Sequence, residues 1–150
     1  MPQSLASLYV HIIFSTKSRV SCLSPEVRAE LFPYMATVLN NLECAAIEIG
    51  GTADHVHVLF RLHKNLSISK VVEAIKTPTS RWLKTKDPDL SEFHWQNGYG
   101  AFSVSASEVE RVREYIVNQE EHHREVSFQE ELRTFFERYD VEYEERYVWD

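Results

Sequence analysis

The sequence lacks any apolar run long enough to cross a membrane, and nothing near its N-terminus resembles a signal peptide. It has only two cysteines, Cys22 and Cys44, and their spacing fits no metal motif. Without signs of secretion, two buried thiols are a better interpretation than a disulfide. Internal repeats and low-complexity linkers are also lacking. With 150 residues, 43% of them hydrophobic, we expect one cytoplasmic domain that makes no contact with a membrane.

The sequence also lacks the excess of basic residues that phosphate binding normally requires, since its formal net charge is −7. The acidity is confined to one part of the chain. Residues 1–107 carry 10 Lys/Arg and 9 Asp/Glu, whereas residues 108–150 carry 6 and 14. Basic side chains are dense between positions 61 and 86, which indicates either a phosphate-facing surface or a solvated helix face. They are Arg61, Lys64, Lys70, Lys76, Arg81, Lys84 and Lys86.

The spacing of apolar residues predicts the order β-α-β-β-α-β, followed by two more helices. The predicted strands are 8–14, 44–49, 55–62 and 99–104, and the first two predicted helices are 25–42 and 68–83. Pro78 should interrupt the second helix near Thr77. Asn97-Gly98 favours a tight turn, which predicts a hairpin between residues 93–95 and the last strand.

The last two helices are predicted from capping patterns, which pair Ser107 with Glu110 and Ser127 with Glu130. The whole order predicts an α+β fold of the ferredoxin-like (RRM-like) type, with an antiparallel sheet and C-terminal helices. Two helices would cover one sheet face and leave the other open to a ligand or partner. We expect a single domain, residues 1–150, divided into a ferredoxin-like core at about 5–105, a helix at about 107–124 and an acidic C-terminal helix at about 127–150.

Two histidines of the third predicted strand are candidates for metal binding. His55, His57 and Arg61 share one face, because side chains alternate along a strand. The two imidazoles lie about 7 Å apart at the backbone, a spacing from which both can reach one cation. Asp54 could orient one of the rings. The alternative is a pair of half-exposed histidines without a ligand.

A tyrosine and a glutamine form the second candidate group. Tyr115 and Gln119 are four residues apart and therefore neighbours on one helical face, which His122 continues. The apolar stripe of this helix points in another direction. Amphipathic packing is one explanation for such a tyrosine. The other is a phenol nucleophile beside a glutamine amide that completes a metal site.

Four motifs, taken in order, carry a resemblance to a known family. They are Asp54-His55-Val56-His57, Lys76 to Arg81, Trp95-Gln96-Asn97-Gly98-Tyr99 with Ser103-Val104, and Tyr115-Ile116-Val117-Asn118-Gln119 with His122-His123. The chain resembles the small single-tyrosine transposases of bacterial insertion sequences, the IS200-like family with its His-hydrophobic-His motif. Their relatives, the repeat-associated tyrosine transposases, share the pattern. The resemblance extends from Tyr9-Val10-His11 to about His123 and leaves the last helix and the acidic tail unassigned.

The resemblance implies specific roles for these residues. His55, His57 and Gln119 would bind a divalent metal ion, Mg²⁺ or Mn²⁺. Tyr115 would attack single-stranded DNA, expel a 3′-hydroxyl and form a 5′-phosphotyrosine that a later 3′-hydroxyl can reseal without ATP. Family members bind DNA hairpins at the ends of the element. They act as homodimers in which the metal ligands and the tyrosine come from different subunits.

The basic residues, two aromatic residues and the remaining histidines are given less specific roles. Phosphate contacts are expected from Lys76 and Arg81, with Lys17 and Arg61 as further candidates. Trp95 is interpreted as a packing residue rather than a base-stacking platform, and so is Tyr99. The remaining histidines are assigned to structural or surface positions: His11, His63, His94 and His123.

Other functions compete with DNA transposition. A non-catalytic single-stranded nucleic-acid-binding module would place aromatic residues on the open sheet face, where this sequence places histidines. A metal-dependent phosphoesterase would use activated water and leave Tyr115 for packing. A host-domesticated relative that acts on repeated hairpins would have the same chemistry as a mobile element's transposase. Only the DNA around the gene would separate those two.

Overall fold

The structure, a computed structural model, describes residues 2–150. Its four strands form one antiparallel sheet in the order β2-β3-β1-β4. The strands are β1 (Tyr9–Ser15), β2 (Ala46–Gly51), β3 (His55–Arg61) and β4 (Gly100–Val104). The two long helices between them are α1 (Pro25–Asn41) and α2 (Ile68–Lys86). Two short 3-10 turns are η1 (Lys17–Arg19) and η2 (Pro88–Leu90). The predicted β-α-β-β-α-β order and the ferredoxin-like class are confirmed.

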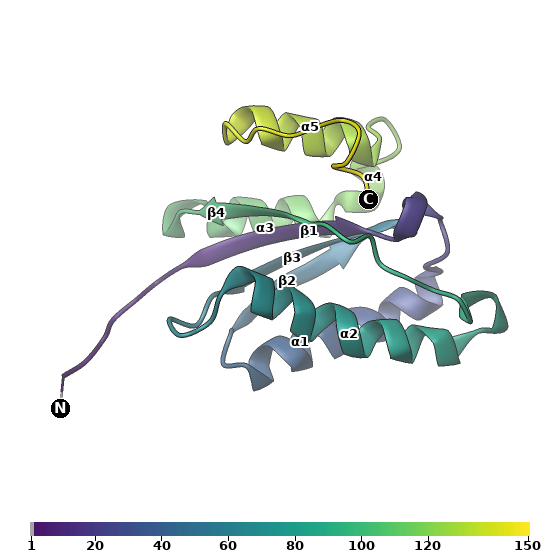
Figure 1. Ribbon diagram of the computed structural model, residues 1–150. Helices are drawn as coiled ribbons and strands as arrows, with labels where there is room; N and C mark the ends of the chain where they lie inside the picture. The colour runs from purple at the N-terminus through teal and green to yellow at the C-terminus, as the bar shows by residue number, and fades with distance from the viewer. Residues whose placement is uncertain (1) are drawn as a thin grey trace.

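Helices α1 and α2 cover one face of the sheet and form the main core with it (Figure 1). The alternation predicted for the third strand is correct, because Val56, Val58 and Phe60 point into this core and are fully buried. Each such side chain contributes about 1.5–3 kcal/mol to stability by leaving water. The opposite side of β3 therefore carries His55 and His57 away from this core.

The break expected in the second helix is wrong, because α2 continues through Pro78 without interruption. A proline inside a helix removes one backbone hydrogen bond. Packing outweighs that loss here: Ile75 before the proline and Leu83 after it are both fully buried against the sheet. The Thr79 hydroxyl also donates a 2.6 Å hydrogen bond to the Ile75 carbonyl in the same turn.

The hairpin expected around Asn97-Gly98 is also wrong. Trp95 pairs with Thr16 just beyond the end of β1, and β4 then pairs with β1 itself in the same antiparallel direction. Residues 96–99 therefore bulge out between two segments that pair with the same strand. The chain does not reverse here, because pairing with β1 overrides the local turn preference.

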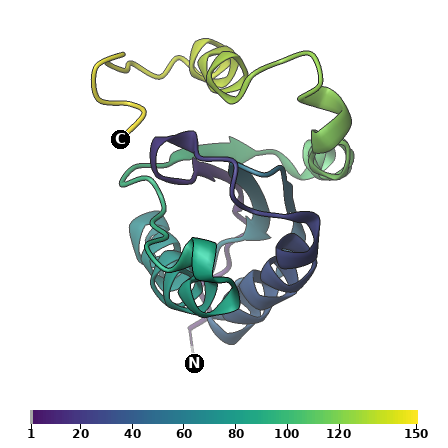
Figure 2. The ribbon, with the colours of Figure 1, turned by 90° about the vertical axis from the view of Figure 1, so that its right-hand side faces the viewer.

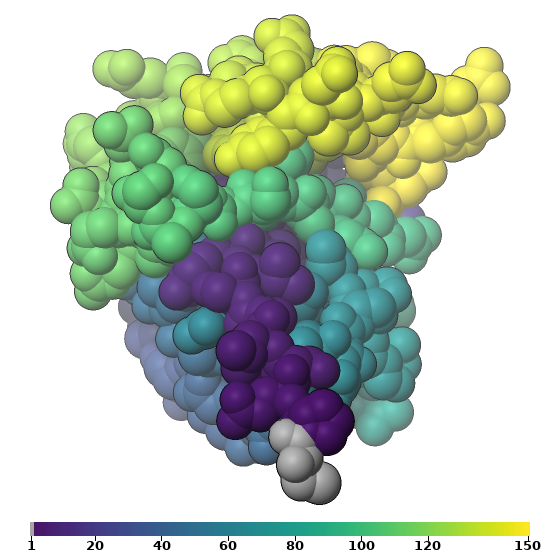
Figure 3. Space-filling view, turned by 90° about the vertical axis from the view of Figure 1, so that its left-hand side faces the viewer, coloured from purple at the N-terminus to yellow at the C-terminus, as the bar shows by residue number. Residues whose placement is uncertain are grey.

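The sheet face that was expected to be open is covered by the C-terminal helix α5 (Phe128–Arg138). The predicted capping by Ser127 is confirmed, since its hydroxyl accepts a hydrogen bond from the Glu130 N–H at 3.2 Å. Four apolar side chains of α5 pack against the sheet: Phe128, Leu132, Phe135 and Phe136. Figure 2 shows α5 as a third layer, on the side of the sheet opposite to α1 and α2. The space-filling view in Figure 3 shows the C-terminal segment, in yellow, lying across the top of the molecule.

The helix that carries Tyr115 lies directly against β2. This helix, α3 (Val109–Val117), follows a 3-10 turn, η3 (Ala106–Glu108), so the predicted Ser107 cap does not form. A short helix, α4 (Gln119–His122), comes next, and Asn118 separates Tyr115 and Gln119 into two helical segments. A Cβ added to Gly50 of β2 would lie only 2.8 Å from the Ile116 carbonyl oxygen. The glycine thus permits close contact between strand and helix.

We expect Gly50→Val to lower the free energy of unfolding by about 1–3 kcal/mol, because the added methyl groups must push α3 away from β2. Urea unfolding of the purified protein measures this. Gly98→Ala is the matched control, since the nearest atom to its added Cβ would be 3.6 Å away, an ordinary contact. Equal midpoints for Gly50→Val and wild type would contradict the close packing of α3.

Two smaller expectations concern the cysteines and membranes. Both cysteines are free thiols, as expected, although Cys22 is only half-buried whereas Cys44 is buried. Within residues 2–150, none of the helices combines the length and the apolar character that crossing a bilayer would need.

Candidate active site and metal centre

Three histidines and one glutamate meet between β3 and α5. The possible ligand atoms of His55, His57, His123 and Glu131 all lie within 4.8 Å of one another. Glu131 Oε1 is 3.0 Å from His57 Nε2, 3.2 Å from His123 Nε2 and 3.6 Å from His55 Nε2. His55 and His57 are fully buried, so the alternative of half-exposed strand histidines is wrong.

Each of the three imidazoles is held through its Nδ1 atom and directs Nε2 toward Glu131. The Nδ1 partners are Asp54 Oδ1 for His55 (2.7 Å), His11 Nε2 for His57 (2.8 Å) and the Val126 carbonyl oxygen for His123. A neutral imidazole that donates from Nδ1 carries a lone pair on Nε2. Three lone pairs and a carboxylate oxygen then face one point.

Such a convergence of electron pairs is unfavourable unless a cation lies among them. His123 Nε2 illustrates this, because it is buried without a well-directed hydrogen-bond partner in residues 2–150, although Glu131 Oε1 lies 3.2 Å away. Imidazole and carboxylate groups are ordinary ligands of divalent metal ions. The cluster therefore suits a divalent metal site.

The charges within the cluster act on one another. Burial lowers the pKa of His57 to about 4, although Glu131 opposes this. Burial raises the pKa of the Glu131 carboxyl, but the neighbouring imidazoles of His123 and His57 outweigh it and hold that pKa well below its usual range. Burial also lowers the pKa of His123, and there Glu131 more than offsets it, so that pKa is raised. At neutral pH His57 is thus neutral and Glu131 ionised, the forms that bind a metal.

Gln119, the third ligand expected from the sequence, lies at the edge of this cluster. Its side chain is buried, and its Oε1 atom is 3.2 Å from His55 Nε2. Its Nε2 atom donates to the Tyr115 carbonyl oxygen at 3.3 Å, which directs the amide oxygen toward the histidines. The structure therefore brings His55, His57 and Gln119 together.

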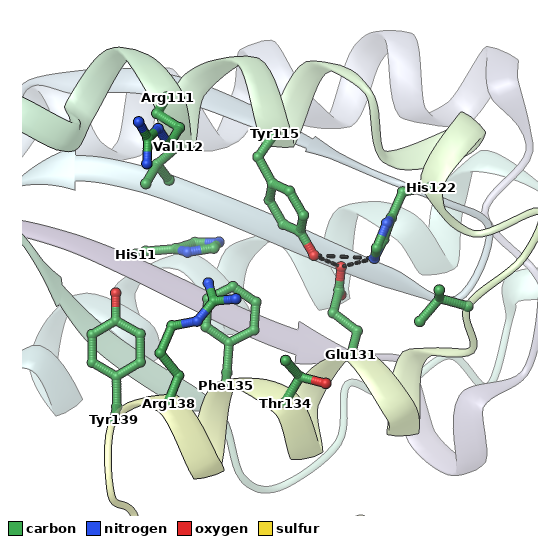
Figure 4. A pocket seen from close by; sticks show the side chains of 11 residues that line it. His11, Arg111, Val112, Tyr115, His122, Glu131, Thr134, Phe135, Arg138 and Tyr139 are labelled. Carbon is green, nitrogen blue, oxygen red and sulfur yellow. Dashed lines mark hydrogen bonds and ion pairs between the residues drawn. The ribbon is translucent and has the colours of Figure 1, made fainter.

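The Tyr115 hydroxyl reaches the same cluster from α3. It donates a short hydrogen bond to Glu131 Oε2 and lies 3.2 Å from His122 Nε2 (Figure 4). Its ring centroid is 5.8 Å from that of His57 in the same chain. Burial and the negative charge of Glu131 raise the pKa of the Tyr115 phenol well above its usual value. The phenol is therefore protonated in this arrangement, with Glu131 as the acceptor of its hydrogen bond.

The four basic residues expected to contact DNA lie in different environments. The Lys76 ammonium donates to the carbonyl oxygens of Gln96 (2.7 Å) and Gly98 (2.8 Å), and burial lowers its pKa to about 8. It fastens the bulge at residues 96–99 to α2, which leaves it poorly placed to contact phosphate. Three residues are exposed: Lys17, Arg61 and Arg81. Because Arg81 belongs to α2, it lies on the opposite side of the sheet from the cluster.

The packing interpretation of Trp95 agrees with its position. The indole is buried and donates a 3.0 Å hydrogen bond from Nε1 to the Thr79 hydroxyl. Tyr99 differs, because 40% of it is exposed.

Sequence reasoning missed two residues of the cluster, His123 and Glu131, and also His11, which contacts His57 from outside it. The two histidines were expected at structural or surface positions, and Glu131 was given no role. A signal for Glu131 was nevertheless present, because it falls within the apolar stripe of α5, one position before Leu132 and three after Phe128. An acidic residue in such a stripe is rarely buried without partners.

Comparison with known proteins identifies the family. Residues 4–119 match the family profile described as "Transposase IS200 like", and the chain belongs to this family. The expected resemblance is thus confirmed, and the protein is a transposase, a DNA-cutting enzyme. A search of curated proteins gave no match. The profile ends before His123 and Glu131, so these two cluster residues come from the part of the chain beyond it.

Two solved structures are similar to this chain. A candidate transposase from Deinococcus radiodurans R1 is 24% identical, with a TM-score of 0.62 over 79% of this chain and 98% of that one. The REP-associated tyrosine transposase bound to a REP hairpin is 13% identical, with a TM-score of 0.56 over 79% of this chain and 72% of that one. At these identities the two likenesses establish the fold.

Proposed function

We propose that this transposase cuts and rejoins single-stranded DNA through a 5′-phosphotyrosine at Tyr115, with a divalent metal ion bound by His55, His57 and Gln119. One observation carries the proposal. The Tyr115 hydroxyl and three imidazole Nε2 atoms converge on the two oxygens of one buried carboxylate, Glu131. This convergence supports Tyr115 as a nucleophile next to a metal site.

A bound divalent ion would polarise the scissile phosphate and orient it. His55 and His57 would hold the ion through Nε2, with Gln119 Oε1, His123 Nε2 and Glu131 Oε1 as further donors. Sites rich in imidazole favour transition metals, so this donor set favours Mn²⁺ over Mg²⁺.

The ring orientations of His55 and His57 are fixed by hydrogen bonds at Nδ1, the ring nitrogen that faces away from Glu131. Asp54 holds His55, and His11 holds His57, which makes His11 a positioning residue rather than a ligand. His11 is buried, and burial, with a smaller contribution from the neighbouring His57 imidazole, lowers the pKa of His11 well below the usual value. It is therefore a neutral partner for the His57 ring.

Proton transfer in the cutting step can be assigned to named atoms. Burial raises the pKa of the Tyr115 phenol, and a divalent ion bound at the histidines would lower it; the Tyr115 proton then passes to Glu131 Oε2, which accepts its hydrogen bond. The phenol oxygen then forms a bond to phosphorus, the bond from phosphorus to the 3′ oxygen breaks, and that oxygen leaves as a 3′-hydroxyl after taking a proton from water. The reverse attack by a 3′-hydroxyl reseals the strand and returns Tyr115 to its free form.

The substrate of this proposal is a single strand that carries a hairpin, since the similar REP-associated enzyme was solved bound to a hairpin. A host-domesticated relative acting on repeated hairpins would use the same site. The non-catalytic binding module loses its main support, because α5 covers the sheet face that such a module needs.

Incubation of the protein with single-stranded DNA from the flanks of its gene, in Mn²⁺, tests the proposal. A denaturing gel should show a covalent protein–DNA band together with a cut strand, and a chelator should remove both. Cut DNA without any covalent band would instead identify a phosphoesterase that uses water, and uncut DNA would reject the proposed activity.

The proposal includes a homodimer, because two-fold contacts are the commonest way for small domains to cover sheet edges. In the structure Tyr115 meets Glu131 and lies beside His57 within one chain. We therefore expect each subunit to hold a complete site. A mixture of Tyr115→Phe and His57→Ala subunits, after confirmed exchange, should remain inactive in the gel assay. Recovery of up to about half the wild-type activity would show that subunits exchange their tyrosine helices.

A further inference from the structure

A pocket of about 290 Å³ opens beside the Tyr115 hydroxyl, between α3 and α5. Figure 4 shows Tyr115 and Glu131 at one end of it, Tyr139 at the other and Arg138 between them. Val112 of α3 and Phe135 of α5 supply apolar walls. The pocket thus combines the proposed nucleophile, a cation and apolar surface.

The guanidinium of Arg138 in this pocket has no acidic partner within residues 2–150. Arg138 is exposed and forms no salt bridge with any residue of the described chain, although residues 108–150 carry 14 acidic side chains. Its guanidinium carbon lies 5.8 Å from the centre of the Phe135 ring. Arg111, on the other wall, is paired with Glu108 at 3.3 Å. Arg138 is therefore the cation that is free to bind an anion.

The aromatic wall is flat. The rings of Phe135 and Tyr139 are nearly parallel, with an angle of 9° between their planes and 6.1 Å between their centroids. Tyr139 is 37% exposed. Exposed flat rings stack on the bases of single strands, and a guanidinium forms paired hydrogen bonds with a phosphate. A base and a phosphate occur together in a nucleotide.

We propose that this pocket binds one nucleotide of the single-stranded substrate next to the scissile phosphate, with its phosphate on Arg138 and its base against the exposed ring of Tyr139, which the buried Phe135 ring supports. The proposal rests on the proposed function, because it places this nucleotide beside the attacking oxygen of Tyr115. It assigns α5, which lies beyond the family match, to the reading of DNA adjacent to the cut.

Binding of single-stranded DNA at increasing salt concentration tests the phosphate contact. Arg138→Gln should bind more weakly than wild type, and its log–log salt slope should be shallower by about 0.7, the value for one phosphate contact on a single strand. Arg124→Gln is the control, because Arg124 is also exposed but lies outside the pocket and is paired with Glu121. A slope that Arg138→Gln leaves unchanged would overturn the phosphate contact, and this assay needs no cutting.

A steric block tests the base. Thr134 is exposed on α5 and lines the pocket, so Thr134→Trp should fill it and slow formation of the covalent adduct at least tenfold, whereas Thr134→Ser should not. A substrate made abasic at the contacted position should slow adduct formation by the wild-type protein similarly and should add nothing to the loss in Thr134→Trp.

If adducts form at the wild-type rate with every abasic substrate and with Thr134→Trp, the nucleotide pocket is wrong while the proposed function stands. If wild type forms no adduct, the proposed function fails, and the salt slopes still decide whether Arg138 binds phosphate.

Discussion

Replacement of Tyr115 by phenylalanine is expected to abolish the covalent protein–DNA adduct completely while leaving DNA binding unchanged. The substitution removes only the hydroxyl that donates to Glu131 Oε2. The ring keeps its edge contacts with His57 and Phe135, whose centroids are 5.8 and 6.0 Å away, so the fold should be retained. A denaturing gel measures the adduct, and a native gel measures binding.

Tyr34→Phe is the matched control for this experiment. Tyr34 lies on α1, in the layer on the other side of the sheet, where its ring packs on Trp82. The control should form the adduct at the wild-type rate. An undiminished adduct from Tyr115→Phe would assign the nucleophile to another residue.

Glu131→Gln is expected to weaken binding of Mn²⁺ by about 100-fold, which corresponds to about 2.7 kcal/mol. Among residues 2–150, Glu131 is the only anion whose oxygen lies among the three imidazole Nε2 atoms, and glutamine keeps its size while removing the charge. The variant should also lose DNA cutting, because glutamine cannot take the Tyr115 proton. Titration calorimetry measures the metal affinity directly.

Glu130→Gln serves as the control, since its carboxylate is exposed and lies on the neighbouring position of the same helix. It should bind Mn²⁺ as wild type does. If Glu131→Gln has the same affinity as Glu130→Gln, the glutamate is a partner of the histidines in the metal-free protein and has no place in the metal site.

Most of the sheet and of helices α1 and α2 could be predicted, because the apolar residues that define them recur at short, regular spacings in the sequence. The alternation in β3 places Val56, Val58 and Phe60 in the core and turns His55 and His57 to the other side. Both features follow from the two-residue period of a strand. The place of Gln119 beside these histidines was implied by the family resemblance and not by any periodicity, and its amide oxygen does lie 3.2 Å from His55 Nε2.

The remaining features depend on contacts between distant parts of the chain. Asn97-Gly98 has a strong local preference for a turn, and pairing of both its flanks with the β1 region overrides it. Pro78 is tolerated because buried residues hold α2 on both sides of it. Docking of α5 could not be read from its own residues, since an apolar stripe does not identify the surface that buries it. Glu131 and His123 were missed for that reason.

The position of Glu131 has a consequence for when this enzyme becomes able to act. The histidine pair on β3 is synthesised early, at residues 55 and 57, whereas the carboxylate that faces both comes at residue 131 of 150. Under the proposed function, a chain that stops before residue 131 lacks one proposed metal ligand and the carboxylate that accepts the Tyr115 hydrogen bond. We therefore expect such a truncated chain to be unable to cut DNA, even when its sheet and first two helices have formed.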